Sequence, residues 1–319
     1  MVMNRLRREL EPRLILVDSV VVDVVLNVEG LPERGSDTYV DRSASFAGGG
    51  FNVMAAASRL GLPAVYAGVV GLGPFATIAQ DAMRDEDIVV AIPPLAGVDT
   101  GFVVAIVEPD GERTFLTSNG AESTLTSSQL DGVDIHTNDV VYFSGYALLH
   151  QSNARALLAL VQRLSPEVLL VFDPSPLVAN IDRGALEVIF ERVDWLSCNA
   201  REASVMTGAS DVIGAAELLL DRLVRGGVIV RCGEEGCVVA SSGSPPEKIE
   251  GFPVDAVDSN GAGDTHVGAF AALLKQGRGA PDAARWANGA AALSVTRRGP
   301  ATGPVMHELE AFIAAHDRS

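Results

Sequence analysis

The sequence predicts an α/β fold in three layers, with a mostly parallel central sheet covered by helices on both faces and a small additional β-sheet. Three observations lead to this prediction. The chain has 319 residues, of which 48% are hydrophobic, enough for a sizeable buried core. Short apolar runs alternate with longer amphipathic stretches, which is typical of parallel strands joined by helices. Two turn-rich stretches break this alternation without any internal repeat, so we expect a single domain over residues 1–319.

The first predicted element is a buried strand in the apolar run from Leu14 to Val28. Asp18 and Asp23 interrupt this run, which is too short to span a bilayer, and no cleavage-site pattern follows it. We therefore expect a purpose for at least one of the two acids. The preceding residues "NRLRREL" are expected to form a solvated arm.

Further strands and helices follow in alternation. The apolar runs predicted as strands are "AVYAGVV" (64–70), "DVVYFSG" (139–145), "EVLLVFD" (167–173), "DWLSCN" (194–199) and "GVIVRC" (227–232). The predicted helices are "FNVMAAASRLG", which ends at Gly61, "SNARALLALVQRL" (152–164) and "IGAAELLLDRLVRGG", which ends at a glycine pair. This order predicts helices on both faces of the sheet.

The two turn-rich stretches, 27–46 and 99–118, alternate polar with apolar residues. Within the second stretch, "FVVAIVEPDGERTFL" predicts a β-hairpin with Asp110 and Gly111 in its turn. Two such insertions can pair into a small sheet that stands off the main domain. Because α/β sheets bind ligands at the carboxyl edge of their strands, we expect this small sheet to form a lid.

The composition excludes several classes of partner. The chain has 24 basic and 41 acidic residues, a net charge of −17, which repels phosphate backbones and anionic membranes. We therefore expect neither nucleic acid nor a membrane as a partner. The three cysteines, Cys198, Cys232 and Cys237, have no metal-ligand spacing and form an odd count, which favours a reducing cytoplasm.

The segment "DSNGAGDTHVGAF" (258–270) predicts a site at the start of a helix. Apolar residues recur at helical spacing after Asp264, so Asp264 lies in the first helical turn. The small residues Gly261, Ala262 and Gly263 let an anion approach the unpaired N–H groups of that helix end. Asp264 then has two possible roles: it satisfies the helix end, or it receives a proton from a hydroxyl that attacks a phosphoryl group.

Five motifs in order decide between these roles. The segment 258–270 resembles the C-terminal signature of the ribokinase-like carbohydrate kinases, the phosphofructokinase-B type. "GGGFNVMAAASRLG" (48–61) is similar to the N-terminal signature of that family, and the three remaining matches are "NARE" (199–202), "RCGEEG" (231–236) and "WANGAAALSVTRRGP" (286–300). The resemblance covers about residues 14–305 and implies a ribokinase-like fold with a lid.

For the chemistry, the resemblance implies that Asp264 is the general base for a hydroxymethyl group. The backbone N–H groups at Gly261, Ala262 and Gly263 would form an anion hole for the transferred phosphoryl group. Such groups carry most of the catalysis, because phosphoryl transfer depends on positioning and charge stabilisation.

For the acceptor, the resemblance implies a site that binds sugar hydroxyls. We expect Asp23 to close the first strand and to accept two hydroxyl hydrogen bonds there; the alternative is a strand-end acid that faces water. Gly48, Gly50 and Asn52 match the sugar-contacting turn of the family.

For the nucleotide, the resemblance implies ATP with Mg²⁺. Asn199 and Glu202 match the pair that organises water and Mg²⁺ near the phosphates, although the same residues also fit an ordinary helix cap. Gly233 and Gly236 would let the backbone run close to the nucleotide, and Asn288 matches a position near the adenine. Arg231 stands where many relatives have threonine; its guanidinium reaches either the ATP phosphates, which we favour, or solvent.

A monovalent cation site is also implied. Asp258 and Asn260 match the loop that binds a cation in many relatives, together with backbone carbonyls around Ser294, Arg297 and Gly299. A carboxylate with several carbonyl oxygens suits K⁺, so potassium activation is expected.

Three departures from the family pattern limit the choice of substrate. Gly49 replaces a common lysine, which favours an unphosphorylated acceptor. No glutamate stands near "YFSGY" (142–146), which puts ribose itself in doubt. His266 takes a place usually held by an aromatic or small residue, where a packing role is expected.

The prediction is an ATP- and Mg²⁺-dependent kinase that phosphorylates the primary hydroxyl of a sugar or nucleoside and forms a homodimer through its lid. A nucleoside or pseudouridine-type kinase remains open beside a free-sugar kinase. One rival class is a nicotinamide dehydrogenase, because "GLGPFA" (71–76) approximates a dinucleotide fingerprint. Another is a non-catalytic sugar-binding regulator, which the intact Asp264 motif disfavours.

Overall fold

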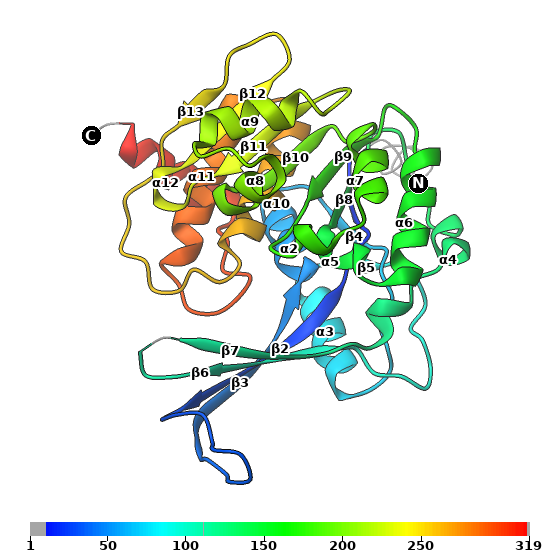
Figure 1. Ribbon diagram of the computed structural model, residues 1–319, viewed down its shortest axis with the longest axis vertical. Coiled ribbons are helices and arrows are strands. Elements are labelled where there is room, and N and C mark those ends of the chain that lie inside the picture. Colours follow the sequence, from blue (N-terminus) through cyan, green and yellow to red (C-terminus); the bar gives the residue numbers. More distant parts are fainter. Residues whose placement is uncertain (1–10, 111, 318–319) are drawn as a thin grey trace.

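The structure is a computed structural model, which describes residues 11–110 and 112–317. Its main body has three layers, a large central sheet between two layers of helices, and a small sheet extends away from it (Figure 1). This arrangement confirms the predicted fold class. The arm before residue 11 lies outside the described residues.

The central sheet has nine strands in the order β13-β12-β11-β10-β9-β8-β1-β4-β5. Their bounds are β1 (Leu14–Leu16), β4 (Ala64–Tyr66), β5 (Val89–Val90), β8 (Val140–Ser144), β9 (Leu169–Asp173), β10 (Trp195–Asn199), β11 (Gly227–Arg231), β12 (Cys237–Ser241) and β13 (Glu247–Ile249). The strands from β5 to β11 pair in parallel, and β12 and β13 are antiparallel to their neighbours. The sheet is therefore mostly parallel.

Helices cover both faces of this sheet. One layer contains α2 (Gly50–Arg59), α3 (Pro74–Asp85), α10 (Ala262–Lys275), α11 (Ala280–Val295) and α12 (Met306–His316). The other layer contains α4 (Ser127–Asp131), α5 (Gly145–Leu148), α6 (Gln151–Arg163), α7 (Arg183–Phe190), α8 (Ala200–Thr207) and α9 (Val212–Leu220). Leu14 and Leu16 of β1 belong to the first core, whereas Ile15 belongs to the second, so the sheet is buried on both faces.

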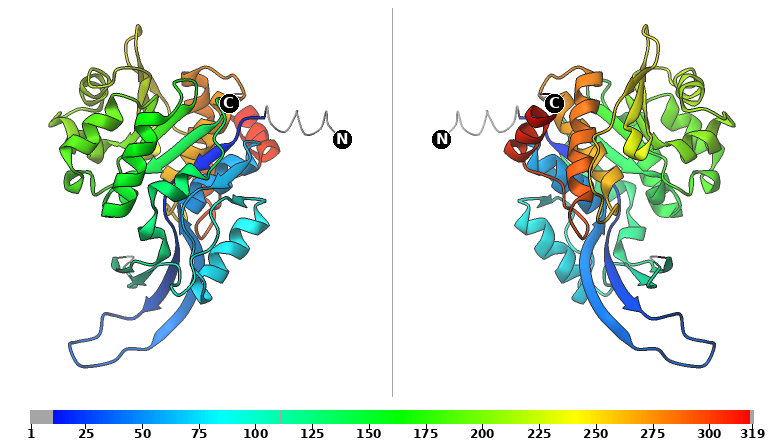
Figure 2. Two further views of the ribbon diagram at one scale, coloured as in Figure 1. Left: turned by 90° about the vertical axis from the view of Figure 1, so that its right-hand side faces the viewer. Right: turned by 90° about the vertical axis from the view of Figure 1, so that its left-hand side faces the viewer.

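The small sheet has four strands in the order β3-β2-β6-β7. They are β2 (Val20–Val28), β3 (Val40–Gly49), β6 (Phe102–Val107) and β7 (Arg113–Ser118). Figure 2 shows this sheet curving away from the main body. The predicted hairpin is present as β6 and β7, which pair antiparallel, although Gly111 in its turn lies outside the described residues.

The prediction of one strand in the run from Leu14 to Val28 is wrong. β1 ends at Leu16 in the central sheet, and β2 begins at Val20 in the small sheet. Asp18 lies at the break, where its carboxylate accepts hydrogen bonds from the N–H groups of Ser19 at 2.7 Å and Ser144 at 2.6 Å. Asp23 consequently lies within β2 rather than at the end of a strand of the central sheet.

Other predicted boundaries differ by a few residues. α2 ends at Arg59 and Gly61 adopts a φ of 86°, so the predicted glycine stop is confirmed. α9 ends at Leu220, before the predicted glycine pair, because turns occupy the residues that lead into β11. No single helix of the described chain is long and apolar enough to cross a bilayer; only the bent pair α8 and α9 passes that test, by length and composition alone.

Candidate active site

The N-terminus of α10 presents unpaired backbone N–H groups. Gly261 precedes this helix with a φ of 74°, a left-handed conformation that favours glycine. The N–H of Ala262 lies 3.3 Å from the carbonyl of Ser259. The N–H groups of Gly261 and Gly263 have no acceptor among residues 11–110 and 112–317. Together with the helix dipole, they form a site that favours an anion.

Asp264 lies in the first turn of α10 and contacts another helix. Its Oδ2 accepts a 2.9 Å hydrogen bond from Nδ2 of Asn52, in the first turn of α2. Burial raises the pKa of Asp264, Asp173 raises it further, and Asn52 and Arg231 lower it. Asn52 thus holds the carboxylate through Oδ2, and Oδ1 remains available to accept a proton.

Asn52 is itself incompletely satisfied. The residue is buried, and its Oδ1 is a buried acceptor without a partner in the described part of the chain. Buried polar atoms usually have hydrogen-bond partners, so this oxygen marks a place where a ligand donor fits.

Asp23 lies beside the turn between β3 and α2. A Cβ at Gly48 would come within 2.3 Å of an Asp23 carboxylate oxygen, so this carboxylate occupies the space that glycine leaves. Burial, and the nearby charge of Asp264, raise the pKa of Asp23 to about 6. Gly50 has a different constraint, because a Cβ placed there would come too close to the buried Leu16. The structure therefore brings Asp23, Gly48 and Asn52 near Asp264.

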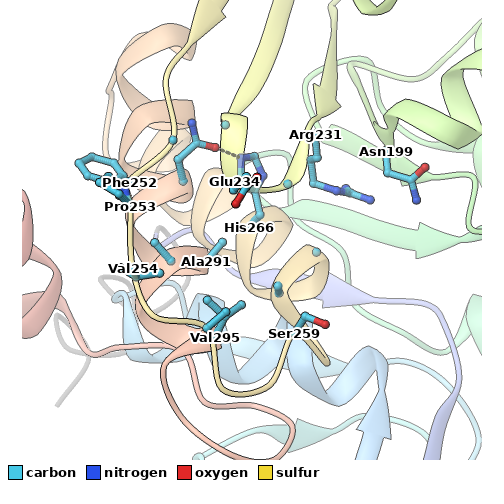
Figure 3. Close-up of a pocket in the computed structure, with 18 residues that line it drawn as sticks. Asn199, Arg231, Glu234, Phe252, Pro253, Val254, Ser259, His266, Ala291 and Val295 are labelled. Carbon is cyan, nitrogen blue, oxygen red and sulfur yellow. Dashed lines mark hydrogen bonds between the residues drawn. The ribbon is translucent and has the colours of Figure 1, made fainter. Parts of the chain in front are cut away.

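A pocket of about 520 Å³ opens beside the start of α10 (Figure 3). Its apolar wall contains Phe252, Val254, Ala291 and Val295, and Arg231 lies near its opposite end. The volume and the mixed lining are typical of a small-molecule site. The pocket thus offers an apolar surface at one end and a positive charge at the other.

Asn199 and Glu202 form a helix cap. Glu202 accepts hydrogen bonds from the backbone N–H of Asn199 at 2.8 Å and from its Nδ2 at 2.7 Å, while Oδ1 of Asn199 accepts from the N–H of Glu202 at 2.8 Å. This capping box is the alternative that the sequence left open. Each carboxylate oxygen keeps a second lone pair, so a water-mediated contact with Mg²⁺ also fits these residues.

The two glycines after β11 have different constraints. Gly233 has a φ of 64°, nothing lies within 4 Å of a Cβ placed there, and its backbone lines the pocket. At Gly236, by contrast, a Cβ would lie 2.1 Å from the carbonyl of Ile249. Gly233 thus leaves space for a ligand, whereas Gly236 is required by the packing of its own chain.

Asn288 and His266 form a closed pair inside the pocket wall. Nδ2 of Asn288 donates to the carbonyls of Ile249 and Glu250 at 3.2 and 3.1 Å, and Oδ1 lies 3.1 Å from Nε2 of His266. Burial lowers the pKa of His266 to about 3, so the imidazole is neutral with its proton on Nε2. Both N–H groups of the Asn288 amide are therefore used within the protein, and His266 is buried at the wall of the pocket.

The loop predicted to bind a cation is held by hydrogen bonds. Asp258 accepts them from the N–H groups of Asn260 at 3.1 Å and Gly299 at 3.2 Å, and Arg113 of β7 lies 3.4 Å away. Burial alone would raise the pKa of Asp258, but these partners lower it overall. The carbonyl of Ser294 accepts from Thr302 at 2.9 Å.

The side chain of Arg297 is engaged in contacts of its own. Its guanidinium contacts the carbonyl of Thr302 at 3.3 Å and the carboxylate of Glu308 at 3.1 Å. No group of three or more histidine, cysteine or acidic residues in the described chain is arranged for a metal ion.

One site residue was missed by the sequence prediction. Asp173 ends β9, and its Oδ2 lies 2.9 Å from Nη1 of Arg231 at the end of β11. The signal was present, because an acid closes the apolar run "EVLLVFD" at the carboxyl edge of the sheet. We expected the Arg231 guanidinium to reach either phosphates or solvent. Its side chain is only 13% exposed, so it does not extend into solvent.

The helix that begins in the fingerprint-like stretch 71–76 has acceptors for its first N–H groups within the chain. Asp99 accepts hydrogen bonds from the N–H groups of Phe75 at 3.1 Å and Ala76 at 2.8 Å, in the first turn of α3. The N-terminus where a pyrophosphate would bind is therefore occupied by a carboxylate of the chain itself.

Comparisons with known proteins agree with this architecture. Residues 11–307 match the pfkB family of carbohydrate kinases. The uncharacterized sugar kinase YegV of Escherichia coli is 30% identical over 92% of each chain. An E. coli protein assigned as ribokinase II, solved in complex with ATP and Mg²⁺, has a TM-score of 0.81 at 25% identity and covers 96% of this chain and 100% of its own. Adenosine kinase of Sinorhizobium meliloti shares the fold, with a TM-score of 0.80 at 21% identity over 97% of this chain and 100% of its own.

The fold and the site thus define a phosphotransferase that uses ATP and has an alcohol group as acceptor. This chain belongs to the pfkB family of carbohydrate kinases. Its three-layer body and separate small sheet are those of the ribokinase-like members of that family.

Proposed function

We propose that this protein transfers the γ-phosphate of ATP to a primary hydroxyl of a sugar or nucleoside. One observation carries the proposal: the carboxylate of Asp264 lies in the first turn of α10, beside unpaired N–H groups of a helix end that lines the pocket, and within electrostatic reach of Asp23. The whole chain acts as one kinase domain, and the small sheet is its lid. A nucleoside or pseudouridine-type kinase is the alternative to a free-sugar kinase.

In the transfer, Asp264 accepts the hydroxyl proton at Oδ1 while Asn52 holds Oδ2. The acceptor oxygen then forms a bond to the γ-phosphorus, and the bond from that phosphorus to the β,γ-bridging oxygen breaks, with its electron pair staying on ADP. The N–H groups of Gly261 and Gly263, with Ala262 between them, stabilise the charge on the phosphoryl oxygens. The lid excludes water and so limits ATP hydrolysis.

For the acceptor, we propose that Asp23 binds two hydroxyl groups and that Gly48, Gly50 and Asn52 form the adjoining turn. The unpaired Oδ1 of Asn52 supports this, because a sugar hydroxyl would supply its donor. Asp23 and Asp264 give this end of the site a negative charge, and Gly49 adds no cation. Both features favour an unphosphorylated acceptor.

For the nucleotide, we propose that the pocket binds ATP with Mg²⁺. Gly233 and Gly236 shape the turn beside the phosphates, and Asn288 supports the adenine wall through His266 and the backbone carbonyls that it binds. Asn199 and Glu202 would hold the water shell of Mg²⁺, and Arg231 would contact the phosphates. Bound Mg²⁺ supplies positive charge that offsets the phosphate oxygens.

We also propose a monovalent cation near Asp258 and Asn260, with carbonyls around Ser294, Arg297 and Gly299. This cation site is tested by comparing turnover in about 100 mM KCl with turnover in about 100 mM choline chloride. Both salts are then near physiological ionic strength. Equal rates would remove this cation from the account and leave the kinase assignment intact. A cytoplasmic location and a homodimer that forms through the lid complete the proposal.

The kinase proposal is tested by ADP release from ATP and Mg²⁺ with panels of unphosphorylated sugars and nucleosides. We expect at least one compound of these panels to raise ADP release well above the rate with water alone. Calorimetry that detects acceptor binding without any turnover would instead indicate a sugar-binding regulator. A response confined to nucleosides would select the alternative substrate class.

A further inference from the structure

Arg231 is anchored at one end of its guanidinium. Nη1 lies 2.9 Å from Oδ2 of Asp173 and donates a 2.5 Å hydrogen bond to Oγ of Ser197. Asp173 also accepts from the N–H of Ser175 at 2.9 Å, so it is itself fixed. The guanidinium is therefore held by neighbours on β9 and β10, and its orientation is determined before any ligand binds.

The other edge of the guanidinium is open. Nε has no hydrogen-bond partner in the described chain, and Nη2 comes no closer than 3.9 Å to Glu202, beyond hydrogen-bond distance. Both nitrogens lie beside the start of α10, because a Cβ on Gly263 would lie 3.6 Å from Nε, 3.7 Å from Cζ and 3.7 Å from Nη2, over this half of the guanidinium. Arg231 also lines the pocket (Figure 3).

Two sets of donors that have no acceptor in the described part of the chain thus lie close together at the start of α10. The Nε–Nη2 edge of an arginine matches two oxygens of a phosphate group, and the N–H groups of Gly261 and Gly263 point to the same helix end. Asp173 is paired with Nη1, and the carboxylate of Glu202 lies 3.9 Å from Nη2, so two acidic groups favour the charged guanidinium at this place.

We propose that Arg231 binds the terminal phosphoryl group of ATP through its Nε–Nη2 edge and that Asp173 is the positioning residue that aims it. This inference deepens the proposed kinase function and depends on it. The protein then carries a permanent cation at the phosphate that is transferred, so it distinguishes ATP from ADP even without Mg²⁺. ADP lacks the group that Arg231 contacts, and its affinity does not depend on this side chain.

The proposal is tested by calorimetric titration of the protein with ATP and with ADP in the presence of EDTA. The ratio of the two dissociation constants is compared between wild type and variants. We expect Arg231→Gln to weaken ATP by roughly 10- to 100-fold, the value of a charge-assisted hydrogen-bonded pair, and ADP by less than about threefold. Arg231→Lys keeps the charge without the fork and should recover part of the loss. Arg155→Gln, on the exposed face of α6, is the matched control and should leave both constants unchanged.

Removal of Arg231 leaves two acidic groups without their cation, so folding is monitored by thermal unfolding. If Arg231→Gln does not fold, Arg231→Gln/Asp173→Asn removes one of these charges and answers the same question. Asp173→Asn alone should weaken ATP more than ADP, because the arginine is present but no longer aimed. An equal loss of ATP and ADP, or no loss, would overturn the role of Arg231 and leave the kinase proposal standing. Wild-type protein that binds neither nucleotide would overturn both.

Discussion

Asp264 combines two requirements that oppose each other. A general base must be ionised, yet burial raises the pKa of this carboxyl, and Asp173 adds to the effect. Asn52 and Arg231 lower the pKa again. Asp18, Asp23 and the phenols of Tyr142 and Tyr146 also lie within electrostatic reach of this group.

The pH dependence of turnover should reflect this balance. Because Asp264 acts when ionised, kcat should fall as the pH decreases through its raised pKa, at a higher pH than an ordinary aspartate would give. Replacement of Arg231 by glutamine removes a charge that lowers this pKa, so the acid limb should move to still higher pH. A pH–rate profile of both proteins checks the direction, and an unmoved limb would show that another group controls it.

The ionised carboxylate of Asp23 should lower the free energy of unfolding at neutral pH, although we expect it to bind the acceptor. Its pKa of about 6 in the folded protein exceeds the ordinary aspartate value of 3.8, so the folded state holds the proton more tightly, and stability is lost as the pH rises from the lower value toward the upper one. Asp23→Asn should therefore raise Tm at pH 7.5 by roughly 1–2 °C, about 1 kcal/mol after allowance for solvent exposure, and change it little at pH 4. The KM of the acceptor should rise in the same variant. A Tm that falls at both pH values would contradict this account.

At the scale of elements, the site depends on the close crossing of α2 and α10. A Cβ on Gly268 would come within 2.4 Å of the carbonyl of Val53 and 3.0 Å of Cβ of Ala56. The absent side chain lets the two helices approach, which brings Asn52 within hydrogen-bond distance of Asp264.

Gly268→Ala should separate these helices. We expect a loss of about 1–3 kcal/mol in the free energy of unfolding, as in other overpacked cores, and a lower kcat, since a small displacement misplaces the base. Chemical denaturation and steady-state kinetics measure the two effects. Gly132→Ala is the control, because a Cβ there meets only the carbonyl of Gln129 at 3.4 Å. Equal behaviour of the two variants would show that the crossing tolerates a methyl group.

The sequence predicted most elements of the central sheet, because continuous β-branched runs are typical of parallel strands that are buried on both faces. It could not predict that the first apolar run divides between two sheets. That division depends on the contact of Asp18 with Ser144, far away in the chain. Similarly, the pairing of Arg231 with Asp173 joins the ends of two separate strands, and no local pattern reveals it.

At the scale of the whole molecule, the small sheet presents two different faces. In the strand register, Asp23 is opposite Phe46 and Val103, so these residues share the face toward the site. Val104 and Leu116 are paired on the other face, and Leu116 is 59% exposed. Leu116 is thus an exposed apolar side chain on the face of the small sheet that points away from Asp23.

The proposed homodimer should therefore depend on Leu116. We expect Leu116→Asp to shift the protein toward monomer in light scattering coupled to gel filtration, because a buried charge opposes association. Leu218→Asp is a matched control, since Leu218 is also exposed, at 49%, but lies on α9 of the main body. A monomeric wild type, or an unchanged mass for Leu116→Asp, would remove this face as the interface.

The most direct measurement for the account as a whole is the turnover of Asp264→Asn with an acceptor identified from the panels. The amide keeps the size of the side chain and its contact region with Asn52, but it cannot accept the hydroxyl proton. We predict that kcat falls at least about 100-fold, the usual contribution of a general base, while Tm and the dissociation constant for ATP stay near the wild-type values. Near-normal kcat in this variant would contradict the assignment of Asp264 as the base.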